Sequence, residues 1–294
     1  MTSSRQHLRD RVESGATVWF AGAQDALSAL LVDQSDFDGV FTTGFGISAA
    51  LLGQPDMELY TLSENVAVVD HIANVVRKPI FADADTGYGN SLNVARTVRA
   101  MEKAGVAALQ LEDQVSPKRC PAAAAQMDTI PISEAVGKLR AAVDARQDPD
   151  LLIVARTDVT DPNEAMDRAA RYAEAGADLI QPIARTFQSY EALVRLHEVC
   201  GRRLSLQLAE GIWMEKLDRT QIESVAGFAT YPLVALMSTV HAVQSNLAAL
   251  SARRGKSIAD LPCGRTSITA FKQLIGWQAL EQRQALYEVD THRA

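Results

Sequence analysis

The stretch EKAGVAALQLED (residues 102–113) has a close counterpart further along the chain, AEAGADLIQPI (residues 173–183). In each, a helix-forming run ends at a glycine, Gly105 or Gly176, and glycine readily takes the left-handed conformation that ends helices. A short link then leads into an apolar run of the kind that forms a buried strand. This helix–glycine–strand unit is typical of proteins in which helices alternate with parallel strands.

Runs of the same character recur along most of the chain. The expected strands are residues 18–23, 39–44, 79–85, 108–113, 151–158, 179–184, 204–209 and 228–233. The expected helices include residues 25–34, 65–76, 93–105, 133–146 and 163–176. Because eight strands alternate with helices, the sequence predicts an α/β fold, a closed (β/α)8 TIM-type barrel. An open, doubly wound sheet is the alternative, but no G-x-G-x-x-G follows the first strand and no G-x-x-x-x-G-K-[ST] occurs.

Length and composition fit one large domain. The chain has 294 residues, of which 47% are hydrophobic and 22% are charged, as in ordinary globular proteins. No low-complexity linker divides it, so we expect a single domain over residues 1–294. Residues 234–294 form a helical extension that exceeds what a barrel needs. We expect part of this extension to pack on a neighbouring subunit of a homo-oligomer.

Charge and cysteine content narrow the class of partner. The net charge of −7 argues against nucleic acid, because binding to phosphates needs a basic face. No apolar run approaches the roughly 18 residues of a membrane helix, and the first residues lack the apolar centre of a signal sequence. The odd number of cysteines, Cys120, Cys200 and Cys263, fits a reducing compartment. We therefore expect a cytoplasmic protein with no membrane partner.

Acidic side chains gather where consecutive strands are expected to end. The third, fourth and fifth strands end in Asp-Ala-Asp, Glu-Asp and Arg-Thr-Asp (83–85, 112–113 and 156–158). These ends face the active site in a barrel, and the period of two in a strand points Asp83 and Asp85 the same way. Crowded like charges are costly without a cation, and oxygen ligands alone favour Mg²⁺ or Mn²⁺. The alternative role for single acids such as Asp113 and Asp158 is to cap the following helix.

Two glycine-containing segments adjoin these strand ends. TGYGN (86–90) follows the third strand, and its glycines would let a ligand approach the backbone closely. The second strand leads through TTGFG (42–46) into a short helical stretch whose first N–H groups would suit a carboxylate or phosphonate oxygen. A plain turn and a plain helix start remain the alternatives.

Five motifs, in order, resemble the isocitrate lyase/phosphoenolpyruvate mutase superfamily. They are DALSA (25–29), TGFGISAALLGQPD (43–56), DADTGYGN (83–90), LEDQVSPKRC (111–120) and ARTD (155–158). The combination of D-A-D-x-G-Y-G with E-D-x-x-x-P-K-R-C is the specific part. The resemblance is closest to the short branch, which contains methylisocitrate lyases, dimethylmalate lyase-like proteins and carboxyphosphonoenolpyruvate mutases.

The resemblance implies a barrel whose last helix is exchanged between subunits, usually in a dimer of dimers, that is, a homotetramer. It also implies Mg²⁺ near Asp83, Asp85 and Glu112, partly through water, with Asp56 in the outer shell. On this reading Asp83 also meets the substrate, and Glu112 takes part in catalysis as well as in holding the metal.

The resemblance further implies how a substrate would be held. Its carboxylate would take the N–H groups around Thr43, Gly44 and Phe45, and Arg156 would hold a charged oxygen and serve in catalysis. In the lyases that the chain resembles, a loop cysteine exchanges a proton with the enolate carbon. Cys120 falls at that position, so the resemblance makes it the expected catalytic acid.

The chain departs from the lyase pattern on the substrate side. Lyases of the superfamily read K-[KR]-C-G-H in the loop, whereas Pro121 and Ala122 follow Cys120 here. Where lyases usually have a glutamate after the sixth strand and an asparagine on the seventh, this chain has Gln181 and Gln207. With the metal side intact, these changes imply the same metal–enolate chemistry on a different substrate, which Gln181 and Gln207 help to select.

The leading hypothesis is a Mg²⁺-dependent lyase. It would cleave a C–C bond of a 2-hydroxy, alkylated di- or tricarboxylate, such as a methylisocitrate- or dimethylmalate-like acid, to an α-oxo acid via an enolate. The first alternative is P–C bond chemistry of the phosphonomutase or phosphonopyruvate hydrolase type. The second is a non-catalytic barrel used for binding, against which the intact acid set speaks. Cys120 separates the first two, because protonation of carbon needs it and phosphoryl transfer does not.

Overall fold

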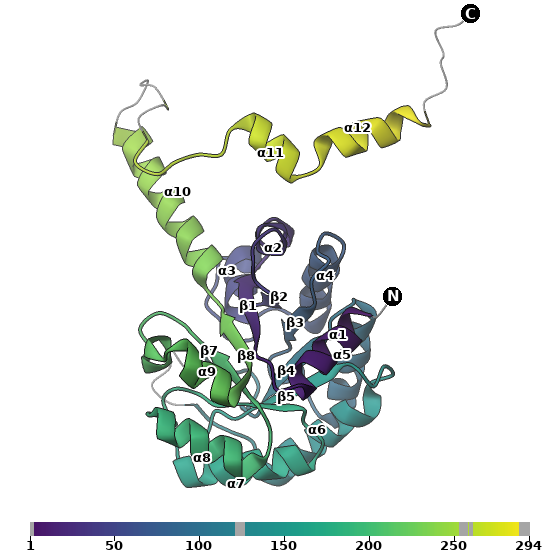
Figure 1. Cartoon of the computed structure of the whole chain (residues 1–294), viewed down its shortest axis with the longest axis vertical. Helices are drawn as coiled ribbons and strands as arrows, with labels where there is room; N and C mark the ends of the chain where they lie inside the picture. Colours follow the sequence, from purple (N-terminus) through teal and green to yellow (C-terminus); the bar gives the residue numbers. More distant parts are fainter. Residues whose placement is uncertain (1–2, 121–126, 253–257, 259–260, 288–294) are drawn as a thin grey trace, which may run out of the picture. The chain divides into compact units, whose positions relative to one another are not determined.

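The computed structural model describes residues 3–120, 127–252, 258 and 261–287. Within these residues, eight parallel strands form a closed barrel in sequence order, and β1 pairs with β8 to close the ring. Figure 1 shows β1 next to β8. The predicted (β/α)8 TIM-type barrel is therefore confirmed. The strands are β1 (Val18–Ala23), β2 (Gly39–Thr42), β3 (Ile80–Asp83), β4 (Ala108–Glu112), β5 (Leu152–Arg156), β6 (Leu179–Gln181), β7 (Leu204–Gln207) and β8 (Ala226–Tyr231).

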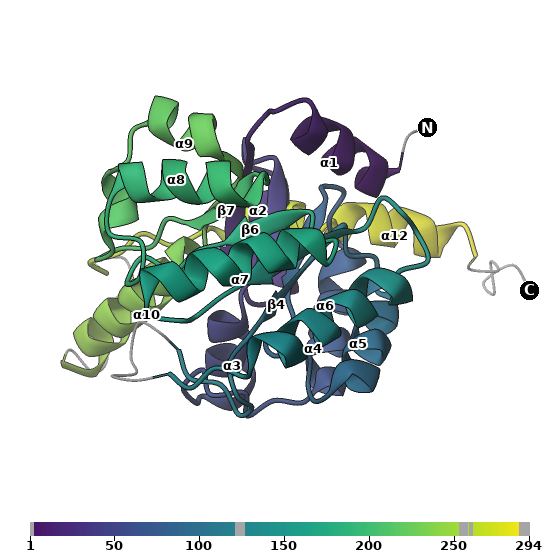
Figure 2. The same cartoon turned by 90° about the horizontal axis from the view of Figure 1, so that it is seen from below.

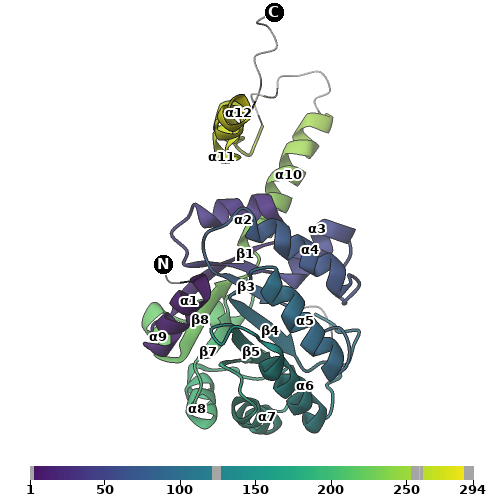
Figure 3. The same cartoon turned by 90° about the vertical axis from the view of Figure 1, so that its right-hand side faces the viewer.

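Helices alternate with the strands and lie around the outside of the barrel. Figure 2 and Figure 3 both show α5 beside α6, and these two helices pack against each other. The helices of this part are α1 (Ser4–Glu13), α2 (Ala26–Asp33), α3 (Gly44–Leu52), α4 (Leu62–Ala73), α5 (Ser91–Lys103), α6 (Ile132–Ala145), α7 (Pro162–Glu174), α8 (Tyr190–Cys200), the 3₁₀ helix η1 (Trp213–Lys216) and α9 (Arg219–Val225).

Local sequence signals set where several helices begin and end. Asp25 and Ser28 cap the start of α2 reciprocally, each side chain accepting the N–H of the other residue. Gly105 and Gly176, which follow α5 and α7, have φ angles of +98° and +102°. The left-handed helix stops predicted for the repeated unit are therefore present.

The amino-terminal half of the barrel interior is closed by aromatic and aliphatic packing. The rings of Phe20, Phe41, Phe81 and Phe228 contact one another, with centroids 4.8–5.6 Å apart. Leu8 of α1 is fully buried in the same cluster. Since this end is filled, the opposite end of the barrel, where the strands finish, is left for a functional site.

The third strand ends earlier than the sequence predicts. β3 stops at Asp83, and Asp85 has a φ of +49°, a left-handed conformation that a strand cannot contain. The prediction that the strand period points Asp83 and Asp85 the same way is therefore wrong, because Asp85 lies in the turn after the strand. The turn, rather than the strand, brings the two carboxylates together.

The chain divides into two compact units, residues 1–237 and residues 238–294. The first holds the barrel. The second contains most of α10 (Val234–Ala252), together with α11 (Ile268–Leu274) and α12 (Trp277–Ala285). Within the helical extension expected over residues 234–294, α11 and α12 are separated at Gly276, whose φ is +70°. A single domain over residues 1–294 stays a prediction. None of the described helices is long and apolar enough to cross a membrane.

Candidate active site

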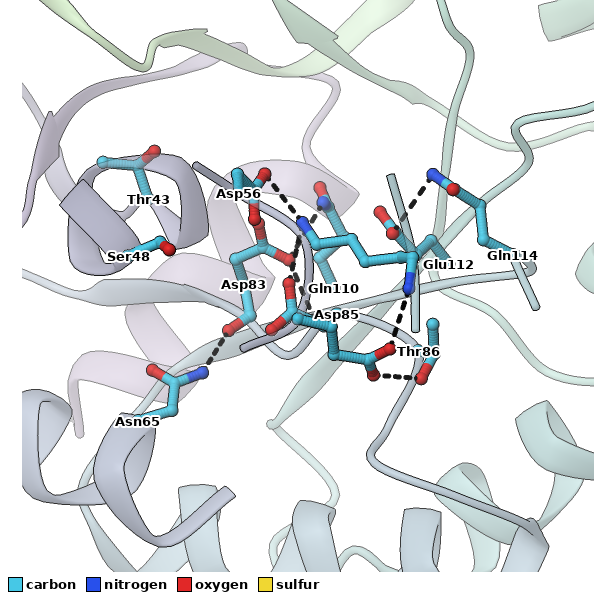
Figure 4. Close-up of polar contacts among 12 residues, drawn as sticks. Thr43, Ser48, Asp56, Asn65, Asp83, Asp85, Thr86, Gln110, Glu112 and Gln114 are labelled. Carbon is cyan, nitrogen blue, oxygen red and sulfur yellow. Dashed lines mark hydrogen bonds and ion pairs between the residues drawn. The ribbon is translucent and has the colours of Figure 1, made fainter. Parts of the chain in front are cut away.

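Four carboxylates from three segments of the chain meet at the carboxyl end of the barrel (Figure 4). Asp83 ends β3, Asp85 follows it, Glu112 ends β4, and Asp56 lies in the link between α3 and α4. Each of the four is at most 6% exposed. The structure thus brings together all four residues expected on the metal side, and we call them the acid cluster.

A lysine ammonium lies inside the acid cluster. Lys118 Nζ is 2.9 Å from Asp56 Oδ2 and 2.8 Å from Asp85 Oδ1, and the lysine side chain is 1% exposed. Burial would lower the pKa of Lys118, but the surrounding carboxylates, Asp85 foremost, raise it well above its ordinary value. Lys118 is therefore a buried ammonium ion. It was not among the predicted site residues.

The pKa values of the carboxylates in the acid cluster shift in different directions. Burial raises the pKa of Asp56, raises the pKa of Asp83 to about 6 and raises the pKa of Glu112 well above its ordinary value. Burial would also raise the pKa of Asp85, but Lys118 outweighs it and lowers that pKa. One lysine therefore neutralises only part of the charge that the cluster carries when fully ionised.

Buried polar groups fix the two aspartates in place. Tyr88 Oη donates a hydrogen bond to Asp85 Oδ2 at 2.9 Å. Asn65 Nδ2 donates to Tyr88 Oη at 2.8 Å. It also donates to the backbone oxygen of Asp83 at 2.9 Å (Figure 4). Tyr88, like Asp85, has a positive φ, +60°, which non-glycine residues rarely adopt unless surrounding contacts hold them there. The ordered turn is thus part of the site.

The first turn of α3 lies directly against the acid cluster. A Cβ atom on Gly44 would be 2.7 Å from Tyr60 Oη and 2.9 Å from Asp83 Oδ2, so a glycine is needed for this approach. The N–H of Thr43 donates to the backbone oxygen of Ala23 at 3.2 Å. The N–H groups of Gly44 and Phe45 belong to the first turn of α3, where N–H groups have no partner within the helix. Of the three predicted donors, these two therefore suit a ligand, whereas Thr43 already bonds Ala23.

Arg156, the last residue of β5, lies between two buried carboxylates. One is Glu112 at the end of β4, and the other is Asp158 just after β5. Arg156 Nη1 is 2.7 Å from Glu112 Oε2, and its Nη2 and Nε donate to Asp158 Oδ1 at 2.8 and 3.2 Å. Asp158 therefore holds Arg156 and caps no helix, since Asp161 is the N-cap of α7. The geometry places Arg156 beside the acid cluster, as expected.

Asp113 supports the site from behind. Its Oδ1 accepts the N–H of Asp158 at 2.9 Å, and its Oδ2 accepts Tyr172 Oη at 2.7 Å and Arg168 Nη1 at 3.1 Å. The carboxylate faces the helix layer, and α6, the next helix, has Pro131 as its N-cap. The helix-capping alternative thus fails for Asp113 as well, which instead fixes the backbone that carries Asp158.

Gln181 and Gln207 lie together on the strands that follow. Gln181 Oε1 accepts Ser205 Oγ at 2.9 Å and Gln207 Nε2 at 3.1 Å. Gln181 pairs with Arg156 in the register of β5 and β6. The two glutamines therefore form a neutral wall of the mouth next to Arg156.

Residues 114–120 run from the end of β4 back over the acid cluster. Lys118 N donates to Glu58 Oε2 at 2.9 Å, and Ser116 Oγ donates to the same oxygen at 2.7 Å. Cys120 is half-buried and forms no disulfide. It follows the buried Lys118 by two residues, a span of at most about 7 Å along the chain. Pro121 and Ala122, where the chain departs from the lyase pattern, lie outside the described residues.

The donor set of the acid cluster fits a hard divalent cation. All its donors are carboxylate oxygens, the ligands that Mg²⁺ and Mn²⁺ prefer, and a cation, the Lys118 ammonium, already stands among them. In this conformation no three His, Cys, Asp or Glu side chains of the described residues are arranged to hold an ion. The fit therefore concerns the chemistry of the residues and not a preformed coordination sphere.

Comparison with known proteins gives consistent matches. The family model described as phosphoenolpyruvate phosphomutase matches residues 8–249. The chain is 35% identical over 284 residues to 2,3-dimethylmalate lyase of Eubacterium barkeri, covering 95% of this chain and 96% of that protein. It is 36% identical over 291 residues to 2-methylisocitrate lyase of Aeropyrum pernix, covering 95% and 89%. The crystal structure of phosphonopyruvate hydrolase in complex with oxalate and Mg²⁺ has a TM-score of 0.85 and 28% identity, over 97% of this chain and 99% of that one.

Proposed function

Because the chain belongs to the phosphoenolpyruvate phosphomutase family and so to the isocitrate lyase/phosphoenolpyruvate mutase superfamily, we propose that it cleaves a C–C bond of a 2-hydroxy, alkylated di- or tricarboxylate. The predicted family is confirmed, and so is the prediction of an enzyme related to carbon–carbon lyases. A methylisocitrate- or dimethylmalate-like acid is the proposed substrate, since both relatives are named for such acids. The observation that carries the proposal is the buried acid cluster, with a cation inside it and Arg156 beside it.

The reaction requires one proton to leave and another to arrive. The hydroxyl group loses its proton to an ionised carboxylate of the acid cluster and becomes the oxo group of an α-oxo acid as the neighbouring C–C bond breaks. The electron pair of that bond passes to the adjacent carbon, which is stabilised as the enolate of its own carboxylate. That carbon then needs a proton, and a positioned acid typically speeds such a step by about 10²–10⁴-fold.

We assign that proton to the thiol of Cys120. Its half-buried position supports this role, because residues 114–120 run from the end of β4 back over the acid cluster. Arg156 is proposed to hold a charged substrate oxygen. An arginine has five N–H donors, and Glu112 and Asp158 engage three of them. The N–H groups of Gly44 and Phe45 are proposed to bind a carboxylate oxygen at the start of α3.

Mg²⁺, or Mn²⁺ in its place, is the proposed cofactor. Asp83, Asp85 and Glu112 would hold it, with Asp56 further out. Such an ion supplies Lewis-acid stabilisation of negative charge that develops on the substrate. The oxygen-only donor set supports this choice, as does the Mg²⁺ named in the structure of the related phosphonopyruvate hydrolase.

The proposal is tested by assaying release of an α-oxo acid from racemic 2,3-dimethylmalate and 2-methylisocitrate in the presence of Mg²⁺. We expect turnover of at least one of them, its loss with EDTA, and its loss in Cys120→Ser. Turnover that survives in Cys120→Ser would show that the assigned proton donor is wrong. Failure of every 2-hydroxy di- and tricarboxylate tried would refute the lyase itself.

P–C bond chemistry is the alternative, and the likeness to phosphonopyruvate hydrolase favours it. Release of phosphate from phosphonopyruvate, without cleavage of any hydroxy acid, would establish this alternative. A purely binding barrel has no observation in its favour. The cytoplasmic location stays a prediction.

We also propose a homo-oligomer, a dimer of dimers, in which the carboxyl-terminal helices of one copy cover the barrel of another. A groove of about 950 Å³ beside β1 and β8 is lined partly by aromatic side chains. Trp19 stacks on Tyr231 with ring centroids 6.3 Å apart, and Phe37 contacts Tyr231 edge-on at 5.9 Å. The helix after β8 would cover this face in a simple barrel.

The carboxyl-terminal unit offers a matching apolar surface. Ile268, Leu280 and Leu286 are 73%, 64% and 79% exposed in the single chain, and large exposed apolar surfaces mark contact sites. Sedimentation equilibrium should show a tetramer for the full chain and a smaller species for Trp19→Arg, with unchanged circular dichroism. A monomeric full chain at micromolar concentration would overturn the proposal.

A further inference from the structure

Lys118 is a fully buried cation that the proposed reaction does not use. Its ammonium contacts Asp56 Oδ2 and Asp85 Oδ1, two oxygens of the acid cluster. A divalent ion held by Asp56 or Asp85 would lie within a few ångströms of this ammonium. Two like charges at a few ångströms in a buried site repel strongly. The lysine and a second cation therefore oppose each other there.

The segment that carries Lys118 is fixed at a second point outside the acid cluster. Glu58 Oε2 accepts hydrogen bonds from the backbone N–H of Lys118 at 2.9 Å and from Ser116 Oγ at 2.7 Å. Glu58 also accepts a hydrogen bond from Thr86 Oγ1. Residues 115–120 are therefore docked by Lys118 inside the cluster and by Glu58 beyond it. The Gln114 side chain also holds the backbone of Arg119, accepting its N–H at 2.9 Å and donating to its carbonyl at 3.0 Å.

We propose that, in the substrate-free protein, Lys118 and the divalent metal compete for the acid cluster, so that metal binding undocks residues 115–120. The inference rests on the metal site of the proposed function. Coupling of this kind is reciprocal: whatever loosens the docked segment strengthens metal binding, and metal loosens the segment to the same degree. Because Cys120 follows Lys118 by two residues, occupancy of the cluster also governs where the proposed proton donor lies.

The first test measures the exposure of the Lys118 amine. An acetylating reagent is applied with and without saturating Mg²⁺, and modification of each lysine is followed by mass spectrometry. Without metal, Lys118 should react at least about tenfold more slowly than the exposed Lys103, since the docked state predominates. With Mg²⁺ the Lys118 rate should rise towards that of Lys103, whose own rate stays constant.

Calorimetry on the same samples measures Mg²⁺ binding itself, so it distinguishes failure of the competition from failure of the proposed metal site. If Mg²⁺ binds and Lys118 stays equally protected, the competition is refuted and the proposed metal site stands. If neither Mg²⁺ nor Mn²⁺ binds at all, the metal part of the proposed function fails, and the inference fails with it.

The second test uses variants that leave the acid cluster itself unchanged. Glu58→Ala removes the outer anchor and should lower the Kd for Mg²⁺ by about fivefold or more. Electrostatics alone predicts the opposite sign, because loss of a nearby negative charge weakens cation binding. Arg119→Met is the matched control: it removes an exposed charge from the same segment and should change Kd less than about twofold. An unchanged or raised Kd in Glu58→Ala would overturn the competition.

Discussion

Gly44→Ala gives a direct test of how closely α3 supports the acid cluster. The residue is the first of α3, and its φ is not in the left-handed region, so alanine suits the backbone. The added methyl group would nevertheless lie 2.9 Å from Asp83 Oδ2 and 3.2 Å from Asp85 Oδ1. To reach an ordinary contact distance of 3.4 Å, the Asp83 carboxylate must move by about 0.5 Å.

The expected size of the effect follows from this displacement. Overpacking a well-packed site costs about 1–3 kcal/mol of stability. Displacing a ligand or its immediate support commonly weakens metal binding by about 10–100-fold. We therefore expect Gly44→Ala to fold, with a modest fall in Tm, and to bind Mg²⁺ or Mn²⁺ at least tenfold more weakly, with a parallel loss of kcat/KM.

Two matched glycines make the result interpretable. Gly46→Ala lies in the same helix turn, but its methyl group meets Thr43 Cγ2 at 2.7 Å and Gln24 Cβ at 2.9 Å. It should lower Tm without a comparable change in metal affinity. Gly137→Ala on α6 meets nothing within 4 Å and should raise stability slightly. If Gly44→Ala keeps the wild-type Kd by calorimetry, or if Gly46→Ala weakens binding as much, the assigned role of the Gly44 contact is wrong.

Four further outcomes are expected. Asp113→Asn breaks a buried ion pair and should lower the urea midpoint by an amount equivalent to about 3–5 kcal/mol, against about 1 kcal/mol for Tyr172→Phe; equal shifts would contradict this. Cys120→Ser should cut lyase turnover by about 10²-fold or more with an unchanged metal Kd by calorimetry. Burial raises the pKa of Asp83 to about 6, and only the ionised form binds metal, so metal affinity should fall about fivefold from pH 6 to pH 5; a flat profile would count against Asp83 as a ligand. Gln181→Glu should change the kcat/KM ratio of two hydroxy acids by about tenfold or more and leave the metal Kd within about twofold, which steady-state kinetics and calorimetry check.

The site residues that the sequence itself predicts are those at the ends of strands. An apolar strand followed by an acid is a local signal, and closure of the barrel brings all such ends to one face. Glu112 and Arg156 pair in register on β4 and β5, and Arg156 pairs with Gln181 on β6. Knowledge of the fold alone therefore makes these residues neighbours.

The rest depends on contacts that no local pattern encodes. Asp85 reaches the cluster through a left-handed turn, held by Tyr88. Lys118 and Glu58 are 60 positions apart in the sequence, and a lysine in a polar loop is ordinarily a solvated side chain. Only the fold of the loop over the barrel shows that Lys118 is buried, and it was missed for this reason. Asp56 was predicted through the resemblance alone.

The charges at the barrel mouth explain why the site is better suited to function than to stability. Five buried carboxylates, Asp56, Asp83, Asp85, Glu112 and Asp158, face two buried cations, Lys118 and Arg156, which leaves three negative charges in excess when all are ionised. Buried charges without partners destabilise a fold, and apolar residues of similar size would serve stability better. The raised pKa values of Asp56, Asp83 and Glu112 are the response of the metal-free protein, because proton uptake reduces the same excess. Lys118 supplies a single positive charge, so a divalent ion in its place would neutralise the acid cluster more completely than the lysine does.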